Sequence, residues 1–269
     1  MDGLSSLAQL NVFLIEPSKV QSQFVTKLLD EMGILHLTAF ADGGSALAAM
    51  GKEAPDLVIS SLYLPDMTGT DLVNAMRDDP ALREAAFILI SSETKHHYLD
   101  PIRQAGACAI LPKPFQREQL RTALLTTLDF LNPNALKLTS DGIDIENLRV
   151  LVVDDSRTAR AFIRHVLENL GIGNILEAEN GRHAVEIIQE NYFDLVFTDY
   201  NMPEMDGKEL VEFIRKESWQ SSVPVMMVSS ERDENRLAAV QNTGVSAVCD
   251  KPFEPKVVKE LIERMLAQE

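Results

Sequence analysis

The residues best suited to chemistry stand at the ends of short apolar runs in the second half of the chain: Asp154, Asp155, Asp199, Ser229 and Lys251. The run Val150–Val153, for example, leads directly into the acidic pair. In a doubly wound parallel sheet, ligands bind outside the carboxyl ends of the strands. We therefore expect one sheet edge to bring together three carboxylates, a hydroxyl and an ammonium group. Three like charges at one place indicate a cation or a reaction that compensates their repulsion.

Each of these residues also has an ordinary structural explanation when it is taken alone. An aspartate at the end of a strand most often caps the helix that follows. Ser229 alone is typical of a turn, and Lys251 is typical of an exposed lysine before a proline. The chemical interpretation is favoured because all of them fall at the same predicted edge.

The chain contains the same pattern twice. Glu16 corresponds to Asp154, an offset of 138 positions, and the same offset pairs Gly33 with Gly171, Ser61 with Asp199, Pro65 with Pro203, Gly69 with Gly207, Arg77 with Arg215, Ser91 with Ser229, Lys113 with Lys251 and Phe115 with Phe253. So many matches without a gap indicate a duplicated domain, and the period has the size of a domain.

Apolar periodicity predicts alternating strands and helices in both halves. One predicted helix face recurs every three to four residues and ends at Gly171, a suitable left-handed cap: Ala159, Phe162, Ile163, Val166, Leu167 and Leu170. Five strand–helix units in each half, with nearly continuous apolar strands, predict an α/β fold whose parallel sheet is covered on both faces. The predicted domains are residues 10–131 and 147–269, joined by a linker at 132–146.

Composition and charge disfavour some classes of function. The 269 residues carry a formal net charge of −16. Residues 1–135 hold 10 Lys and Arg against 16 Asp and Glu, or −6, and residues 136–269 hold 15 against 25, or −10. Such a surface repels phosphate, so nucleic-acid binding is disfavoured. Two cysteines without a C-x-x-C motif, and no apolar run long enough to span a bilayer, lead us to expect a cytoplasmic protein that does not bind membranes.

The second half resembles the receiver domain of two-component response regulators, close to the single-domain chemotaxis regulator. The residues that carry the resemblance are Val152–Ser156, Asp199–Gly207, Ser229 and Lys251–Phe253. The resemblance implies a flavodoxin-like sheet order 2-1-3-4-5 and a cis bond between Lys251 and Pro252. It also implies that a histidine kinase or phosphotransfer protein donates a phosphoryl group from phosphohistidine to Asp199. Mg²⁺ would then be held by Asp154, Asp155, Asp199 and the backbone carbonyl of Asn201.

Physical reasoning agrees with these implied roles. The Asp199 carboxylate is the nucleophile, and a hard divalent cation lets it meet a negatively charged phosphoryl group. Lys251 supplies a point charge, and Ser229 can hydrogen-bond the phosphoryl group only after transfer, which would bias a loop between two positions. We expect removal of Lys251 to impair switching more than folding, because its partner charges would be fully present only with metal and phosphate bound.

The first half resembles the same family but departs where the chemistry happens. It has Glu16-Pro17 in place of the acidic pair, Ser61 in place of the acceptor and Tyr63 in place of Asn201. Loss of two of three carboxylates removes most of the ligand charge for a metal. We interpret this half as a pseudo-receiver that phosphohistidine cannot phosphorylate. Its role stays open between a docking or dimerisation surface, including a homodimer, and restraint of the second domain.

The family's usual output face is helix 4, strand 5 and helix 5, here roughly Glu234–Thr243, Val245–Cys249 and Glu254–Ala267, so we expect phosphorylation-dependent binding of a downstream protein. Val248 stands where the family usually carries an aromatic switch residue. The chain is not expected to be an enzyme, since aspartyl-phosphate hydrolases carry a second Asp where this chain has Asn201. Two alternatives remain: a docking scaffold that never uses phosphate, and the N-terminal regulatory part of a longer effector.

Overall fold

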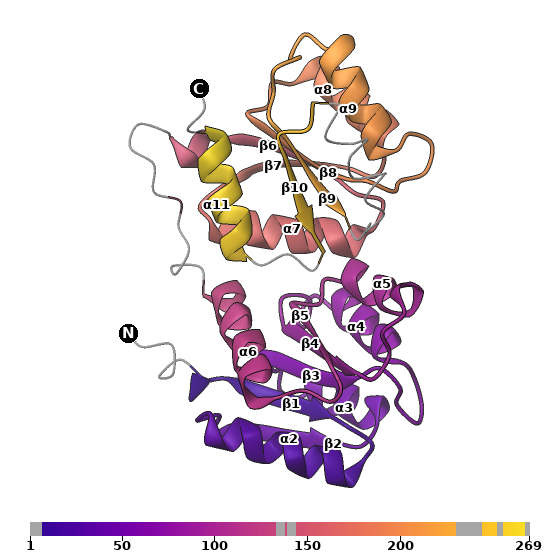
Figure 1. Ribbon diagram of the computed structural model, residues 1–269, viewed down its shortest axis with the longest axis vertical. Coiled ribbons are helices and arrows are strands. Elements are labelled where there is room, and N and C mark those ends of the chain that lie inside the picture. Colours follow the sequence, from indigo (N-terminus) through magenta and orange to yellow (C-terminus); the bar gives the residue numbers. More distant parts are fainter. Residues whose placement is uncertain (1–6, 133–137, 139–143, 230–243, 252–254, 267–269) are drawn as a thin grey trace. The chain divides into compact units, whose positions relative to one another are not determined.

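The computed structural model describes residues 7–132, 138, 144–229, 244–251 and 255–266. Contacts divide the chain into two compact units, unit 1 at Met1–Asn132 and unit 2 at Pro133–Glu269. Each unit is a five-stranded parallel sheet with helices packed against it (Figure 1). In the part of the chain that the structure describes, no helix is both long enough and apolar enough to cross a membrane.

Unit 1 alternates strands and helices throughout. Its strands are β1 (Asn11–Ile15), β2 (His36–Phe40), β3 (Leu57–Ser61), β4 (Ala86–Ser91) and β5 (Ala109–Pro112). Its helices are α2 (Lys19–Glu31), α3 (Gly43–Met50), α4 (Gly69–Asp78), α5 (His96–Gln104) and α6 (Arg117–Leu131). The strand order is β2-β1-β3-β4-β5.

Unit 2 repeats this arrangement. Its strands are β6 (Arg149–Val153), β7 (Asn174–Ala178), β8 (Leu195–Asp199), β9 (Val225–Ser229) and β10 (Ala247–Asp250), and its sheet order is β10-β9-β8-β6-β7. Its described helices are η1 (Ile145–Asn147), α7 (Arg157–Asn169), α8 (Gly181–Glu190), α9 (Gly207–Lys216) and α11 (Pro255–Leu266). The predicted order 2-1-3-4-5 is therefore confirmed in both halves. The helix expected at Glu234–Thr243 lies outside the described residues.

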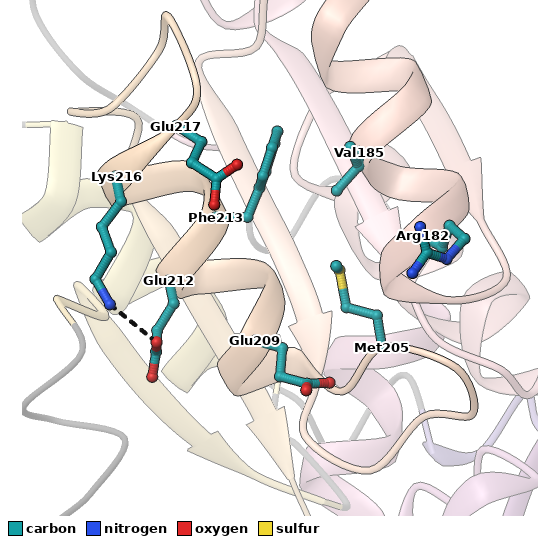
Figure 2. Close-up of a pocket in the computed structure, with 8 residues that line it drawn as sticks. All are labelled: Arg182, Val185, Met205, Glu209, Glu212, Phe213, Lys216 and Glu217. Atoms are coloured by element: carbon teal, nitrogen blue, oxygen red, sulfur yellow. Dashed lines mark hydrogen bonds and ion pairs between the residues drawn. The ribbon is translucent and has the colours of Figure 1, made fainter.

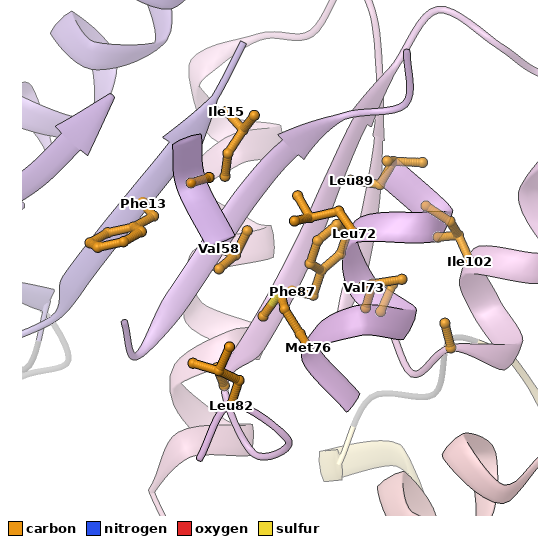
Figure 3. Packing of buried hydrophobic residues seen from close by; sticks show 14 of the residues in the cluster. Phe13, Ile15, Val58, Leu72, Val73, Met76, Leu82, Phe87, Leu89 and Ile102 are labelled. Carbon is orange, nitrogen blue, oxygen red and sulfur yellow. The ribbon is translucent and has the colours of Figure 1, made fainter. Parts of the chain in front are cut away.

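The central strands are buried on both faces, which explains their unbroken apolar sequence. Every residue of β3 and of β8 is buried, as expected when helices cover both sides of a parallel sheet. In unit 1, Phe87 on β4 packs in one cluster with Leu72 and Met76 of α4 (Figure 3). Full burial of each such side chain stabilises the fold by roughly 1.5–3 kcal/mol.

Helix boundaries in unit 2 follow capping chemistry that is visible in the sequence. The Ser156 hydroxyl accepts a hydrogen bond from the Ala159 N–H and starts α7. Asp206 and Glu209 form a capping box at the start of α9. Gly171 adopts a φ of 99° after α7, the left-handed conformation expected of a glycine cap.

The predicted linker contributes one anchored residue to unit 2. Leu138 is 7% exposed, and its N–H donates to the Leu170 carbonyl at 3.2 Å. Apolar burial and a backbone hydrogen bond together tie this point of the linker to the end of α7.

Candidate functional site

The register of the unit 2 sheet gathers the predicted residues at one edge. Strand β8 pairs in parallel with β6 and with β9, and β9 pairs with β10, where Asp250 lies opposite Ser229. Asp199 and Ser229 are the last residues of β8 and β9, Asp154 directly follows β6, and Lys251 directly follows β10. The predicted convergence at the carboxyl ends of the strands is confirmed.

Lys251 joins two buried carboxylates. Its Nζ lies 2.6 Å from Asp154 Oδ2 and 2.9 Å from Asp199 Oδ1, and none of the three side chains is more than 2% exposed. The expectation that the partners of Lys251 are fully present only with metal and phosphate is therefore wrong. The lysine already pairs with two carboxylates that the fold has removed from water, so we expect its loss to destabilise the fold as well as to impair switching.

The remaining carboxylate oxygens accept backbone hydrogen bonds. Asp154 Oδ1 accepts from the Ser156 N–H at 2.9 Å, and Asp199 Oδ2 accepts from the Asn201 N–H at 3.2 Å. Asp155 is exposed, and one oxygen from each of the three aspartates lies within 4.8 Å of the others. Among the described residues this is the only group of three or more His, Cys, Asp or Glu side chains close enough to hold one metal ion.

Burial sets the electrostatics of this cluster. It raises the pKa of Asp199 to about 6, a shift that Lys251 opposes and that Asp154 and Asp155 reinforce. Burial likewise raises the pKa of Asp154. Burial lowers the pKa of Lys251, but attraction to the two carboxylates outweighs this and the net shift is upward. Three carboxylates share one ammonium group here, a surplus of negative charge that a bound cation would offset.

Arg160 is a positioning residue that sequence analysis missed. Its Nη1 donates to the backbone carbonyls of Asp154 at 2.6 Å and Asp155 at 3.4 Å, and its Nε pairs with Glu177 at 3.2 Å. It thus fixes the backbone of the acidic pair from α7. An arginine on the polar side of a helix does not by itself indicate a positioning role. Comparison of the two halves does indicate one, because Arg160 and Glu177 occur only in the half with the acidic pair, and Ser22 and Ala39 stand at the corresponding positions of the first half.

The segment after the predicted acceptor requires a glycine. A Cβ atom at Gly207 would collide with the backbone carbonyl oxygen of Asp199. The corresponding Gly69 approaches the carbonyl of Ser61 in the same way. Helix α9 can therefore begin directly against the end of β8, and this explains why the glycine recurs in both halves.

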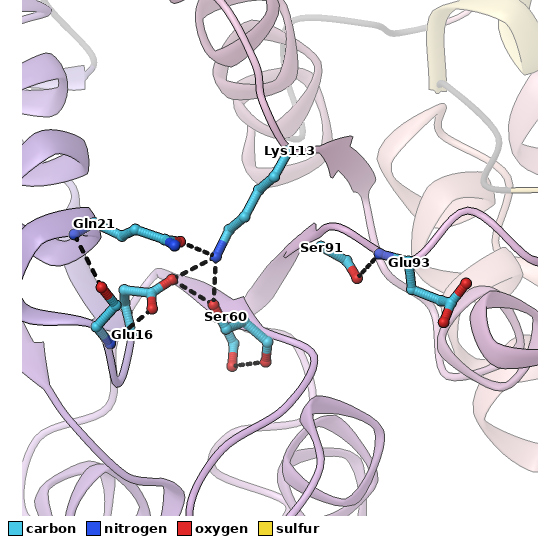
Figure 4. Close-up of polar contacts among 8 residues, drawn as sticks. Glu16, Gln21, Ser60, Ser91, Glu93 and Lys113 are labelled. Atoms are coloured by element: carbon cyan, nitrogen blue, oxygen red, sulfur yellow. Dashed lines mark hydrogen bonds and ion pairs between the residues drawn. The ribbon is translucent and has the colours of Figure 1, made fainter.

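Unit 1 has a closed polar network at the corresponding edge (Figure 4). Lys113 Nζ donates to Glu16 Oε2 at 2.6 Å, to Gln21 Oε1 at 2.6 Å and to Ser61 Oγ at 3.0 Å. The Ser61 hydroxyl donates to the same Glu16 oxygen at 2.5 Å. Burial would raise the pKa of Glu16, but these bonds and the Ser18 N–H outweigh it and the pKa is lowered. One carboxylate and one ammonium group thus satisfy each other.

The Lys113–Pro114 bond is cis. The cis bond predicted for Lys251–Pro252 involves Pro252, which lies outside the described residues.

The fold and these sheet-edge sites define a protein of two flavodoxin-like domains. The chain belongs to the response regulator receiver family: the response regulator receiver domain matches residues 12–125 and again 150–263. The chain is thus a tandem receiver protein.

Among curated proteins, the chemotaxis protein CheY homolog of Campylobacter jejuni is 39% identical over 120 residues, which cover 44% of this chain and 92% of the relative. Among solved structures, the chemotaxis protein CheY4 of Vibrio cholerae is 30% identical, covering 44% of this chain and 98% of that chain with a TM-score of 0.41. The receiver domain of the Arabidopsis thaliana histidine kinase CKI1 is 26% identical, covering 46% and 92% with a TM-score of 0.42.

Proposed function

We propose that this protein is a two-component response regulator that accepts a phosphoryl group on Asp199 from a phosphohistidine donor. The observation that carries the proposal is the buried Asp199 carboxylate, held 2.9 Å from the Lys251 ammonium group beside two further aspartates. A structural ion pair alone would need one carboxylate for one lysine. The surplus of negative charge favours a site that receives a cation and then a phosphoryl group.

The proposed transfer is a nucleophilic displacement at phosphorus. One oxygen of the Asp199 carboxylate forms a bond to phosphorus as the phosphorus–nitrogen bond of the donor breaks. The electron pair of that bond stays on the imidazole nitrogen, and Asp199 becomes an acyl phosphate. Lys251 neutralises charge on the oxygens of Asp199 and of the incoming group. Ser229, buried at the end of β9, is proposed to hydrogen-bond the transferred group.

The donor set fits Mg²⁺. Asp154, Asp155 and Asp199 present hard oxygen ligands within reach of one ion, and we propose that the backbone carbonyl of Asn201 completes the protein's share. When bound, the ion supplies positive charge between the carboxylate and the phosphoryl group. The exposed Asp155 is the carboxylate most open to a cation arriving from water.

The proposal is tested by incubating the wild-type chain with a small acyl phosphate, in Mg²⁺ or in excess EDTA, and measuring intact mass. We expect a gain of one phosphoryl group in Mg²⁺ and none in EDTA. Absence of uptake in Mg²⁺ would favour the alternative of a docking scaffold that does not use phosphate.

The variant Asp155→Asn tests metal binding separately from the other roles of the site. In EDTA at neutral pH the variant should be more stable by about 1 kcal/mol, because it removes an exposed charge that repels two buried carboxylates. In Mg²⁺ the wild type should gain stability and the variant should gain much less. Amide hydrogen exchange in β8 reports the free energy of unfolding of unit 2. Asp250→Asn, an exposed aspartate at the end of β10, is the matched control, and an equal Mg²⁺ response in all three proteins would contradict the assignment.

We further propose that unit 1 is a pseudo-receiver. At this sheet edge Glu16 is the single carboxylate in place of three, which leaves little ligand charge for a metal. It accepts from Ser61 and from Lys113, and because these bonds lower its pKa it is a weak base for activating the serine. Its role stays open between docking or dimerisation and restraint of unit 2.

The proposed output is binding of a downstream protein by the face that includes β10 and α11, rather than substrate turnover. Whether the chain is also the regulatory part of a longer effector remains an alternative.

A further inference from the structure

An apolar groove lies between α8 and α9 of unit 2, and the proposed phosphoryl transfer does not use it. It encloses about 400 Å³ and is lined by Arg182, Val185, Met205, Glu209, Glu212, Phe213, Lys216 and Glu217. Figure 2 shows Val185 of α8 facing Phe213 of α9, with Met205 below them and the charged side chains around the rim. The three apolar residues are only partly buried and pack against the core cluster of unit 2. They therefore expose apolar surface to the groove while the core supports them from behind.

Two exposed aromatic residues stand at the ends of the same two helices. Tyr192 is 50% exposed just after α8, and Trp219 is 63% exposed just after α9. Their ring centroids are 6.2 Å apart. Gln220 fixes this arrangement, because its Nε2 donates to the Ile188 carbonyl at 3.2 Å and to the Asn191 carbonyl at 2.8 Å. Exposed, rigidly placed aromatic residues are typical of energetically dominant positions in protein interfaces.

The duplicated unit shows that folding does not require these aromatic side chains. Alanine stands at each corresponding position of unit 1, where Ala54, Ala75 and Ala81 replace Tyr192, Phe213 and Trp219.

The structure supports this alignment of the two halves. Arg77 Nη1 donates to the carbonyls of Arg83 and Ala85, and Arg215 Nη1 donates to those of Ser221 and Val223, each 138 positions later. The same fold thus forms in unit 1 with alanine at these three positions, so the exposed rings of Tyr192 and Trp219 are not required to form it.

Charge indicates what kind of partner fits. The groove rim carries three glutamates against one arginine and one lysine, and residues 136–269 carry a net charge of −10. Glu212 already pairs with Lys216 at 3.0 Å and with Lys208 at 3.8 Å, whereas within the described part of the chain Glu217 forms no ion pair. A second copy would bring the same acidic face and be repelled. A partner with lysine or arginine beside apolar anchors would be attracted.

We propose that this face, the α8–α9 groove together with Tyr192 and Trp219, binds a basic amphipathic helix of a partner protein. The apolar residues of that helix enter the groove over Phe213, in the helix-in-groove mode, and its lysine or arginine residues lie along the glutamate rim. Phosphorylation of Asp199 is not required for this contact, which is formed by residues outside the acidic cluster.

Trp219 gives a direct test, because it is the only tryptophan in the chain. The 269-residue chain is titrated with a leucine–lysine helical peptide of about four turns, and with the same peptide carrying glutamate in place of lysine. The lysine peptide should move Trp219 emission to shorter wavelength in a saturable manner, and the glutamate peptide should leave it unchanged. The double variant Tyr192→Ala, Phe213→Ala, which installs the residues of unit 1, should weaken binding more than tenfold.

Leu176→Ala, at an exposed leucine on β7, and Asp155→Asn are the matched controls, and both should bind the lysine peptide as the wild type does. Circular dichroism establishes that each variant is folded. Equal binding by the double variant, or an equal response to both peptides, would overturn the proposal. Trp219 emission that shifts with protein concentration alone, together with a doubled mass in solution, would assign the face to a second copy and overturn it as well.

Discussion

Asp199→Asn is expected to abolish stable uptake of a phosphoryl group. The amide nitrogen and oxygen of asparagine cannot form the acyl phosphate that a carboxylate forms, while the side chain keeps nearly the same shape beside Lys251. In Mg²⁺ with a small acyl phosphate, intact mass should show one added phosphoryl group on the wild type and none on the variant. This difference between full and absent modification is the largest effect that the proposed function predicts.

Ser61→Ala is the matched control for the duplicated site. Ser61 occupies the place of Asp199 in unit 1, but its hydroxyl donates to Glu16 and accepts from Lys113. We expect this variant to take up phosphate as the wild type does. Loss of uptake in Ser61→Ala, with uptake kept in Asp199→Asn, would mean that the active and inactive halves have been assigned the wrong way round.

Lys251→Met should destabilise unit 2 by about 3–5 kcal/mol in EDTA at neutral pH, the range observed when one partner of a buried ion pair is removed. The variant leaves Asp154 and Asp199, both fully buried, without the ammonium group that neutralises them. Hydrogen exchange of the β8 amides measures the change. Lys256→Met, at an exposed position of α11, should change the free energy of unfolding little, and a similar value for the two variants would contradict the argument.

The stability that unit 2 loses in Lys251→Met should depend on pH. The folded pKa of Asp199 is about 6, above that of an unfolded aspartate, so its ionisation works against folding above pH 6 and this penalty is relieved as pH falls toward 4. Without Lys251 the penalty grows, because the favourable charge is gone. Loss of Lys251 should raise the pKa of Asp199 further above 6, so the variant should recover part of its stability, relative to wild type at the same pH, as the pH falls from 8 toward 6. A deficit that stays constant from pH 8 to pH 5 would mean that lost packing of the lysine stem dominates.

The sequence determined the fold and the place of the site for reasons of local chemistry. Apolar strands and helix faces with glycine caps define the doubly wound units. Parallel strands carry whatever follows their carboxyl ends to one edge, so Asp154, Asp199 and Lys251 had to meet. The same reasoning showed that unit 1 lacks two of the three carboxylates, because corresponding positions could be compared at a fixed offset.

Only the tertiary structure decided which charged side chains pair with one another. Contacts between residues far apart in the chain depend on side-chain direction and burial, which the order of residues does not specify. Lys251 therefore proved to be engaged by two buried carboxylates without metal or phosphate, and Arg160 proved to hold the backbone of the acidic pair. The exposed aromatic pair Tyr192 and Trp219 likewise emerged only when the ends of α8 and α9 were placed side by side.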